Sequence, residues 1–191
     1  MRKILFFLFL IPLIVNAQKS PYQYFEIRDN VSLFEAVYSA PGNSANDLSK
    51  RLFDICNGMS SVKDVKNSDG IITGLITHMY FPYKKYGLGG MNMNAALKFP
   101  MKFNFKINTK QDKYKVTITG LYFDMQDFKD AMSGTPGILA AATSSDFTLD
   151  DLLCRNRKMD YRTSGKAIRE NTSLEKFLYE TFKLKKNDDT W

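Results

Sequence analysis

Hydrophobic and polar residues alternate most regularly between positions 101 and 119. The apolar members of this pattern are Met101, Phe103, Phe105, Ile107, Tyr114, Val116 and Ile118. Successive side chains of a strand point to opposite faces, so a period of two predicts two strands with one apolar and one hydrated face. The polar residues 108–112 between the two runs predict a turn. We therefore expect an antiparallel hairpin whose apolar face is covered by a helix.

Two other segments have the character of strands. Residues 31–38 are rich in β-branched and aromatic side chains, and residues 71–81 alternate imperfectly after the turn signal at 67–70. Residues 18–30 contain aromatic side chains without a clear period. We expect them to form an extended N-terminal arm that precedes the core.

Two segments have the spacing of amphipathic helices. The first follows Ser44, whose side chain can cap free amides while Asp47 reaches back, as in a capping box. Its apolar stripe consists of Leu48, Leu52, Ile55, Cys56 and Met59. The second helix is predicted to begin at another capping box, residues 172–175, and its stripe consists of Leu174, Phe177, Leu178, Thr181 and Phe182. The predicted order is strand, helix, three strands and helix.

The first 17 residues predict export. Arg2 and Lys3 precede the apolar run 4–15, and residues 15–17 match a small-residue cleavage signal. The apolar run has about twelve residues, whereas a helix that crosses a bilayer needs about twenty. We expect cleavage before Gln18, release to the periplasm or exterior of a bacterium, and no membrane-spanning segment in the mature chain.

The charge of the chain bears on its partners. The formal net charge is +7, and loss of Arg2 and Lys3 with the signal leaves +5. The basic residues occur in small groups rather than in one long tract, a pattern typical of a solvated surface. Export also separates the chain from most nucleic acid. The expected partner is an envelope protein or a glycan, not a nucleic acid.

The two cysteines, Cys56 and Cys154, allow two interpretations. An oxidising compartment permits a disulfide between them. Both cysteines also lie beside apolar residues in segments with helical character, where a buried thiol acts as a small hydrophobe. The sequence does not decide between these alternatives.

No group of residues predicts catalysis or metal binding. His78 is the only histidine of the chain, and a lone histidine in a strand is more often structural or solvent-facing than catalytic. The cysteines and this histidine lack the spacing of a zinc site. The glycine-rich residues 87–90 lack the Lys-Ser/Thr that ends a phosphate-binding loop. We expect no catalytic residue, no metal and no cofactor, and we do not expect an enzyme.

A loop rich in tyrosine and glycine, residues 80–94, is the candidate contact surface. Its candidate partner-contact residues are Tyr80, Tyr83, Tyr86 and Leu88. A tyrosine joins a flat apolar body to a polar tip, which suits contact with a protein or a glycan. The first functional hypothesis is an exported, non-catalytic binding or assembly protein of the cell envelope that uses this loop or the sheet face.

A second hypothesis is a carrier of a small apolar ligand. A curved sheet held by a helix can enclose a pocket between them. The residues expected to line such a pocket are Leu52, Phe103, Phe105 and Ile107. A hydrolase is the third and least favoured hypothesis, because His78 would have to serve it.

Three segments carry a likeness to a known family. They are residues 46–53 at the helix start, residues 65–74 at the turn into a strand, and residues 101–119. Together with the export signal and the order of elements, they resemble a family of secreted bacterial proteins of unknown function with a TBP-like domain. The likeness covers roughly residues 31–123.

The resemblance implies a fold and a location. The implied fold is α+β, with a curved antiparallel sheet of four to five strands packed on one face by helices. We expect one domain over residues 31–191, made of this core and a C-terminal helical extension at 124–191. The family carries no established activity, and a TBP-like shape is not evidence for DNA binding.

Overall fold

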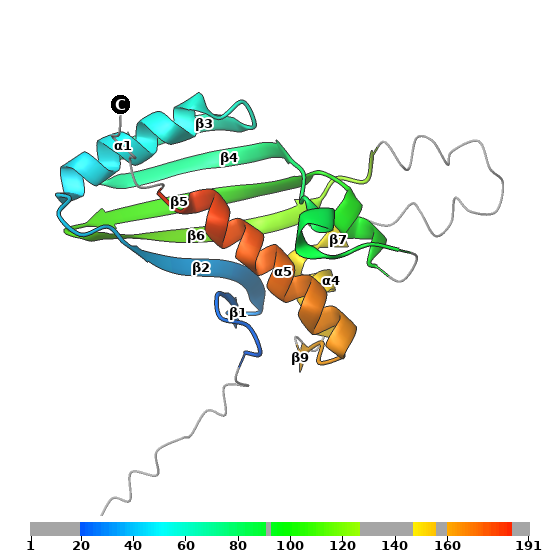
Figure 1. Cartoon of the computed structure of the whole chain (residues 1–191). Helices are drawn as coiled ribbons and strands as arrows, with labels where there is room; N and C mark the ends of the chain where they lie inside the picture. The colour runs from blue at the N-terminus through cyan, green and yellow to red at the C-terminus, as the bar shows by residue number, and fades with distance from the viewer. Residues whose placement is uncertain (1–19, 91–92, 127–146, 156–159, 185–191) are drawn as a thin grey trace, which may run out of the picture.

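The computed structural model describes residues 20–90, 93–126, 147–155 and 160–184. The predicted signal segment 1–17 lies outside these residues. A large antiparallel sheet is covered on one face by the helices α1 (Ala45–Gly58) and α5 (Gly165–Phe182) (Figure 1). The predicted α+β class, with helices packed on an antiparallel sheet, is confirmed.

Within the described residues, the sheet has seven strands. Six of them follow the order β1-β2-β6-β5-β4-β3, and β7 pairs with β6. Their bounds are β1 Phe25–Arg28, β2 Val31–Ser39, β3 Val62–Ser68, β4 Ile71–Met79, β5 Met101–Lys110, β6 Lys113–Phe123 and β7 Phe147–Thr148. The remaining elements of the described residues are η1 Tyr83–Tyr86, η2 Ala95–Lys98, α4 Leu149–Leu153 and the paired strands β8 Cys154–Arg155 and β9 Asp160–Tyr161.

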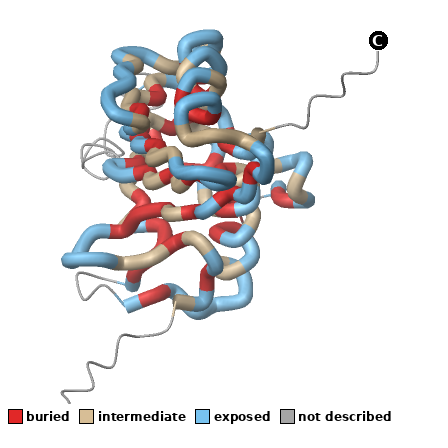
Figure 2. The backbone as a smooth tube through the Cα atoms, turned by 90° about the vertical axis from the view of Figure 1, so that its left-hand side faces the viewer, coloured by how far each residue is buried: buried red, intermediate tan, exposed pale blue. Residues whose placement is uncertain are grey.

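The central hairpin β5–β6 forms as predicted. Ile107 pairs with Val116, and Phe105 pairs with Ile118. All seven apolar residues of the alternating pattern are buried. Figure 2 shows buried positions gathered in the interior of the molecule and exposed positions at its outer turns.

The sheet is larger than the four or five strands expected. The edge strand β3 escaped prediction because its sequence is polar and because a bulge between Lys63 and Lys66 interrupts its alternation, with Asp64 at a φ of 55°.

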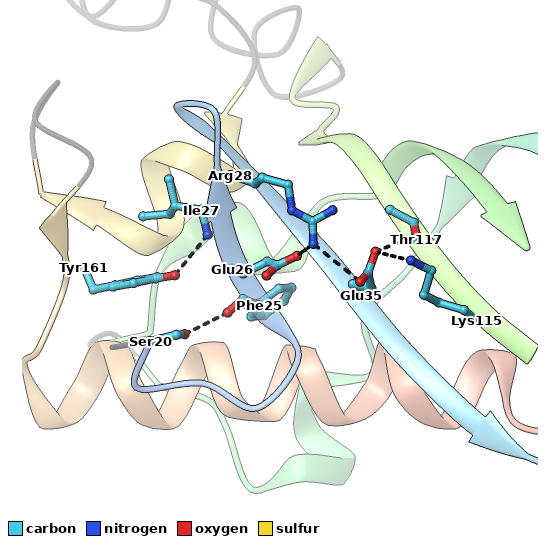
Figure 3. Close-up of polar contacts among 9 residues, drawn as sticks. All are labelled: Ser20, Phe25, Glu26, Ile27, Arg28, Glu35, Lys115, Thr117 and Tyr161. Atoms are coloured by element: carbon cyan, nitrogen blue, oxygen red, sulfur yellow. Dashed lines mark hydrogen bonds and ion pairs between the residues drawn. The ribbon is translucent and has the colours of Figure 1, made fainter. Parts of the chain in front are cut away.

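The strand β1 lies within the segment expected to be an extended arm. Its residue Phe25 is buried and pairs with Phe34 of β2. The hydroxyl of Ser20 donates to the carbonyl of Phe25 at 2.8 Å, and the N–H of Ile27 donates to the hydroxyl of Tyr161 at 3.0 Å (Figure 3). Residues 20–28 therefore pack with the core.

Helix α1 begins where the sequence predicts it. The hydroxyl of Ser44 accepts a hydrogen bond from the N–H of Asp47 at 3.1 Å. The carboxylate of Asp47 accepts from that hydroxyl at 2.6 Å, and not from the backbone N–H that a capping box would use. The buried side of the helix consists of Leu48, Ser49, Leu52 and Cys56.

Helix α5 begins earlier than predicted. Ser164 is its N-cap and accepts from the N–H of Ala167 at 3.3 Å, so residues 172–175 lie inside the helix. The predicted capping box was therefore wrong. Glu175 is buried and accepts hydrogen bonds from the backbone N–H groups of Tyr24 and Phe25, the second at 2.7 Å. Its carboxylate satisfies backbone donors of the N-terminal segment instead of a helix end.

Candidate functional site

A pocket of about 730 Å³ lies between α1, the C-terminal end of α5 and the sheet. Its apolar lining consists of Leu52, Ile55, Cys56 and Met59 from α1, Ile107 from β5, and Phe182 and Leu184 from the end of α5. Pockets that hold small molecules usually measure about 300–1,000 Å³ and are lined mainly by apolar groups. The pocket therefore has the size and lining of a small-molecule site.

The helix α1 forms one wall of the pocket. Leu52 and Cys56 face the sheet and are buried, whereas Ile55 is 40% exposed at the rim. Ile55 and Cys56 follow Leu52 by three and four residues, so the three side chains lie on one face of α1. This face forms both the buried floor of the pocket and part of its rim. Met59, the residue after the helix, completes this wall.

The side chain of Tyr114 holds the opposite wall. Its hydroxyl donates to the carbonyl of Phe182 at 2.8 Å and accepts from the N–H of Leu184 at 2.9 Å. Burial raises the pKa of Tyr114 to about 12, so the hydroxyl keeps its proton at neutral pH. The two hydrogen bonds fix the last turn of α5, which lines the pocket, to strand β6.

A column of stacked tyrosines supports Tyr114. Tyr38 of β2 stacks on Tyr114 with ring centroids 4.8 Å apart, and Tyr179 of α5 stacks on Tyr38 at 4.7 Å. Tyr24 stacks on the other side of Tyr179 at 4.8 Å. The hydroxyl of Tyr38 also donates to the carbonyl of Tyr179 at 3.1 Å. This column joins the N-terminal segment, the sheet and α5 next to the pocket.

Charged side chains of both signs surround the pocket. The acidic ones are Asp47, Asp54 and Glu180, and the basic ones are Lys50, Arg51 and Lys183. Three charges of each sign leave the rim without a formal net charge. The rim therefore does not favour an ion of either sign over a neutral ligand.

Two solved structures are similar to the chain. No family model matches the chain, and no curated protein matches it. A TBP-like protein from Parabacteroides distasonis has 12% identity and a TM-score of 0.46, over 82% of this chain and 93% of that one. A DUF4468 family protein from Bacteroides ovatus has 11% identity and a TM-score of 0.47, over 85% and 92%. These two structural neighbours are thus a TBP-like protein and a DUF4468 family protein, both from bacteria.

Of the four residues expected to line a carrier pocket, the structure brings two to the site. Leu52 and Ile107 line the pocket, as predicted. Phe103 and Phe105 are buried beneath Phe182, with ring centroids 6.5 and 5.6 Å from its ring. The ring of Phe182 thus separates them from the pocket. Phe182 was predicted on the apolar stripe of the second helix, but the sequence did not show over which part of the sheet that stripe lies.

The tyrosine-rich loop folds back onto α5. Tyr86 donates to the carboxylate of Glu180 at 2.6 Å, and its ring lies 6.4 Å from that of Phe177. Tyr83 packs against the core, and Leu88 is buried at 4% exposure. Of the four candidate contact residues, Tyr80 is the exposed one, at 55%. The loop is used mainly for contacts within the chain, and buried Leu88 is not accessible to a partner.

The two cysteines lie in different parts of the structure and both are free thiols. Cys56 lines the pocket, and burial raises its pKa to about 11. Cys154 lies in β8, where its sulfur is 3.7 Å from the hydroxyl of Ser32, and burial raises its pKa. Of the two alternatives that the sequence left open, the structure contains buried thiols and no disulfide between them.

His78 is exposed, and its ring packs edge-on against Tyr80 at 4.9 Å. Within the described residues, no group of three or more histidine, cysteine, aspartate or glutamate side chains could hold a metal ion. In the same part of the chain, no helix combines the length and the apolar character needed to cross a membrane.

Proposed function

We propose that the chain is an exported, non-catalytic binding protein of the bacterial cell envelope, and that its ligand is a small neutral apolar molecule held between α1 and α5. The observation that carries this proposal is the apolar pocket of about 730 Å³ lined by Leu52, Ile107 and Phe182. The carrier hypothesis requires such a pocket between sheet and helix. The Tyr80–Leu88 loop supports the adaptor hypothesis less well, because it contacts α5.

The chemistry of the lining supports a binding role. The aliphatic, aromatic and thioether side chains of the lining can desolvate a ligand but do not transfer protons. The charged side chains of the pocket are three acidic and three basic residues around it, and their formal charges balance. Among the apolar lining residues, Cys56 carries a sulfur that could act as a nucleophile. Its pKa of about 11 keeps it a protonated thiol at neutral pH. The exposed His78 lies on β4 and is not among the pocket residues.

The N-terminal pattern supports the location. A positive start, a short apolar run and a small-residue cleavage signal are features of a secretory precursor. An apolar molecule that crosses the aqueous periplasm needs a protein that shields it from water. A pocket whose rim has no formal net charge suits that task.

The experiment is native mass spectrometry of the chain purified from a bacterial envelope fraction. We expect one small apolar molecule per chain, released when the chain is unfolded by acid or organic solvent. The matched variants are Ile55→Glu, which places a charge at the pocket rim, and Val37→Glu, which places one on the opposite face of the sheet. Both replaced side chains are exposed, at 40% and 58%, so folding should tolerate either change.

The Ile55→Glu chain should carry much less ligand than the parent, and the Val37→Glu chain should carry as much. Equal loading of the two variants would contradict the pocket as the binding site. A parent chain that never carries a small molecule, or that carries only polar ones, would contradict the proposed function.

A further inference from the structure

The strands gather lysines from distant parts of the sequence on one face of the sheet. Directly paired residues of an antiparallel sheet share a face, so the registers show which side chains lie together. Lys66 pairs with Thr73, Thr73 with Lys106, and Lys106 with Thr117. Lys110 pairs with Lys113 at the end of the central hairpin. The seven residues that we call the lysine face are Lys63, Lys66, Lys102, Lys106, Lys110, Lys113 and Lys115.

The lysine face is the side of the sheet opposite to the core. Phe105 and Ile107, the neighbours of Lys106 in β5, are buried under the helices. The helices α1 and α5 both lie on their side of the sheet (Figure 1). Five of the seven lysines are exposed and form no ion pair with any residue that the structure describes, namely Lys63, Lys66, Lys106, Lys110 and Lys113.

Acidic side chains neutralise only the border of this face. Glu35 of β2 binds Lys115 at 3.1 Å and Arg28 at 3.4 Å, and it accepts from the hydroxyl of Thr117 at 3.2 Å (Figure 3). Burial raises the pKa of Glu35, but the hydrogen bonds from Lys115 and Arg28 outweigh it and hold the pKa below its usual value. Lys102 pairs with Asp124 at 2.6 Å. The unpaired lysines therefore lie toward β3 and the β5–β6 turn, where the exposed carboxylates Asp64 and Asp112 also form no ion pair with a described residue.

We propose that the lysine face binds an acidic polysaccharide. Neighbouring strands are about 4.8 Å apart, so Lys66 and Lys106, two strands apart, are separated by about 10 Å across the sheet. Along β5 the lysines 106 and 110 are about 13 Å apart. Ammonium groups at these separations complement carboxylates or sulfates that recur along an extended chain of sugars.

The residues between the lysines favour a sugar chain over a membrane. They are Thr73, Asn104, Asn108, Thr117 and Thr119, whose hydroxyl and amide groups can bind sugar hydroxyls. Proteins that lie on membranes place large apolar side chains beside their lysines to enter the lipid. The exposed apolar residues here are Val37 and Ile71, both β-branched. Tyr122 pairs with Lys102 at the border of the face, where it is half-buried and its ring lies 6.0 Å from that ammonium group. Single-stranded nucleic acid would require several exposed aromatic side chains for stacking along the row of lysines.

The test measures binding of the purified full chain to polygalacturonate, a polysaccharide of repeating carboxylates, by affinity electrophoresis at several salt concentrations. Dextran, vesicles of phosphatidylglycerol and duplex DNA serve as comparison ligands. The variant K66Q/K106Q/K113Q removes three charges from the lysine face. The control K84Q/K98Q/K176Q removes three exposed lysines that lie outside it.

The parent should bind polygalacturonate in preference to dextran, vesicles and DNA at equal ionic strength. The lysine-face variant should bind at least about tenfold more weakly. Its affinity should also depend less on the salt concentration, because fewer counterions are released. The control should bind within about twofold of the parent. If the triple variant fails to fold, the single variants K66Q, K106Q and K113Q should each weaken binding.

Equal losses in the two triple variants would overturn the proposal, as would tighter binding to vesicles or DNA, or no binding of the parent to the acidic polysaccharide. The Ile55→Glu variant should keep its polysaccharide binding. A failure of this proposal is therefore distinguishable from a failure of the pocket as a ligand site.

Discussion

The hydroxyl of Tyr114 accepts a hydrogen bond from the backbone N–H of Leu184 at 2.9 Å, and so connects strand β6 to the residue that follows the end of α5. The same hydroxyl donates to the carbonyl of Phe182 at 2.8 Å. Phe182 and Leu184 both line the pocket between α1 and α5. One buried hydroxyl therefore satisfies two backbone groups at a helix end and determines the position of a pocket wall.

The substitution Tyr114→Phe tests this connection. It removes both hydrogen bonds and leaves the ring in the tyrosine column, so we expect the free energy of unfolding to fall by about 1–3 kcal/mol. Urea unfolding followed by circular dichroism measures the change. Tyr122→Phe is the control, because no described residue makes a hydrogen bond with its hydroxyl in the structure and its free energy of unfolding should change by less than about 0.5 kcal/mol. Equal effects of the two changes would contradict the role assigned to Tyr114.

The stability of the chain should fall at high pH. Burial raises the pKa of Tyr114 to about 12 and also raises that of Tyr38, whereas an unfolded tyrosine ionises near pH 10. The unfolded state therefore loses these protons first, and stability is complete below about pH 10 and declines as the pH rises toward the folded pKa. Urea midpoints between about pH 8 and about pH 11.5 measure the decline. Tyr114→Phe should make it less steep, and an unchanged slope would contradict the assignment.

Both cysteines should be free thiols that react slowly with a thiol reagent. Both are buried and free, and burial raises the pKa of each. We expect two thiols per chain when the purified protein is unfolded without a reductant and titrated with a thiol reagent. In the folded state both should react slowly at neutral pH, because little thiolate is present. No titratable thiol after unfolding would indicate a Cys56–Cys154 disulfide and contradict the structure.

The carboxylate of Glu175 should hold the N-terminal segment on α5. It accepts from the N–H groups of Tyr24 and Phe25, and Phe25 begins β1. Glu175→Ala leaves these donors without an acceptor, so we expect a loss of about 1–3 kcal/mol and faster amide hydrogen exchange across β1. Lys176→Ala, on the exposed side of the same helix, should change neither. If β1 stays equally protected in Glu175→Ala, the carboxylate does not anchor it.

Some elements of the fold could be predicted because their signals are local. The alternation in β5 and β6 repeats over many residues, and Ser44 lies directly before the apolar stripe of α1. Each of these patterns arises because one side of a single strand or helix is buried along the whole length of that element. Tertiary context did not alter them.

Other elements could not be predicted because their stabilising contacts lie far away in the sequence. The signal at residues 172–175 matched a helix start, but the tertiary contact of Glu175 with Phe25 gives that residue a different role. The bulge at Asp64 conceals β3. The polar lysines of β3, β5 and β6 looked like separate small groups, and only the strand registers bring them to one face.

The candidate site was partly predictable for the same reason. Leu52 and Ile107 were expected to line a pocket because each lies on the apolar side of its own element. Phe182 covers Phe103 and Phe105, and that contact depends on where α5 crosses the sheet. The Tyr86–Glu180 hydrogen bond likewise turned an expected partner surface into an internal contact.

The central claim is that an apolar ligand enters the pocket between α1 and α5, and titration with the neutral dye Nile red tests it most directly. The parent chain should bind one dye molecule with a saturable rise in fluorescence, Val37→Glu should match it, and Ile55→Glu should bind about tenfold more weakly because a charge at the rim must be desolvated. The same affinity in Ile55→Glu as in the parent, or no saturable binding by the parent, would contradict the claim.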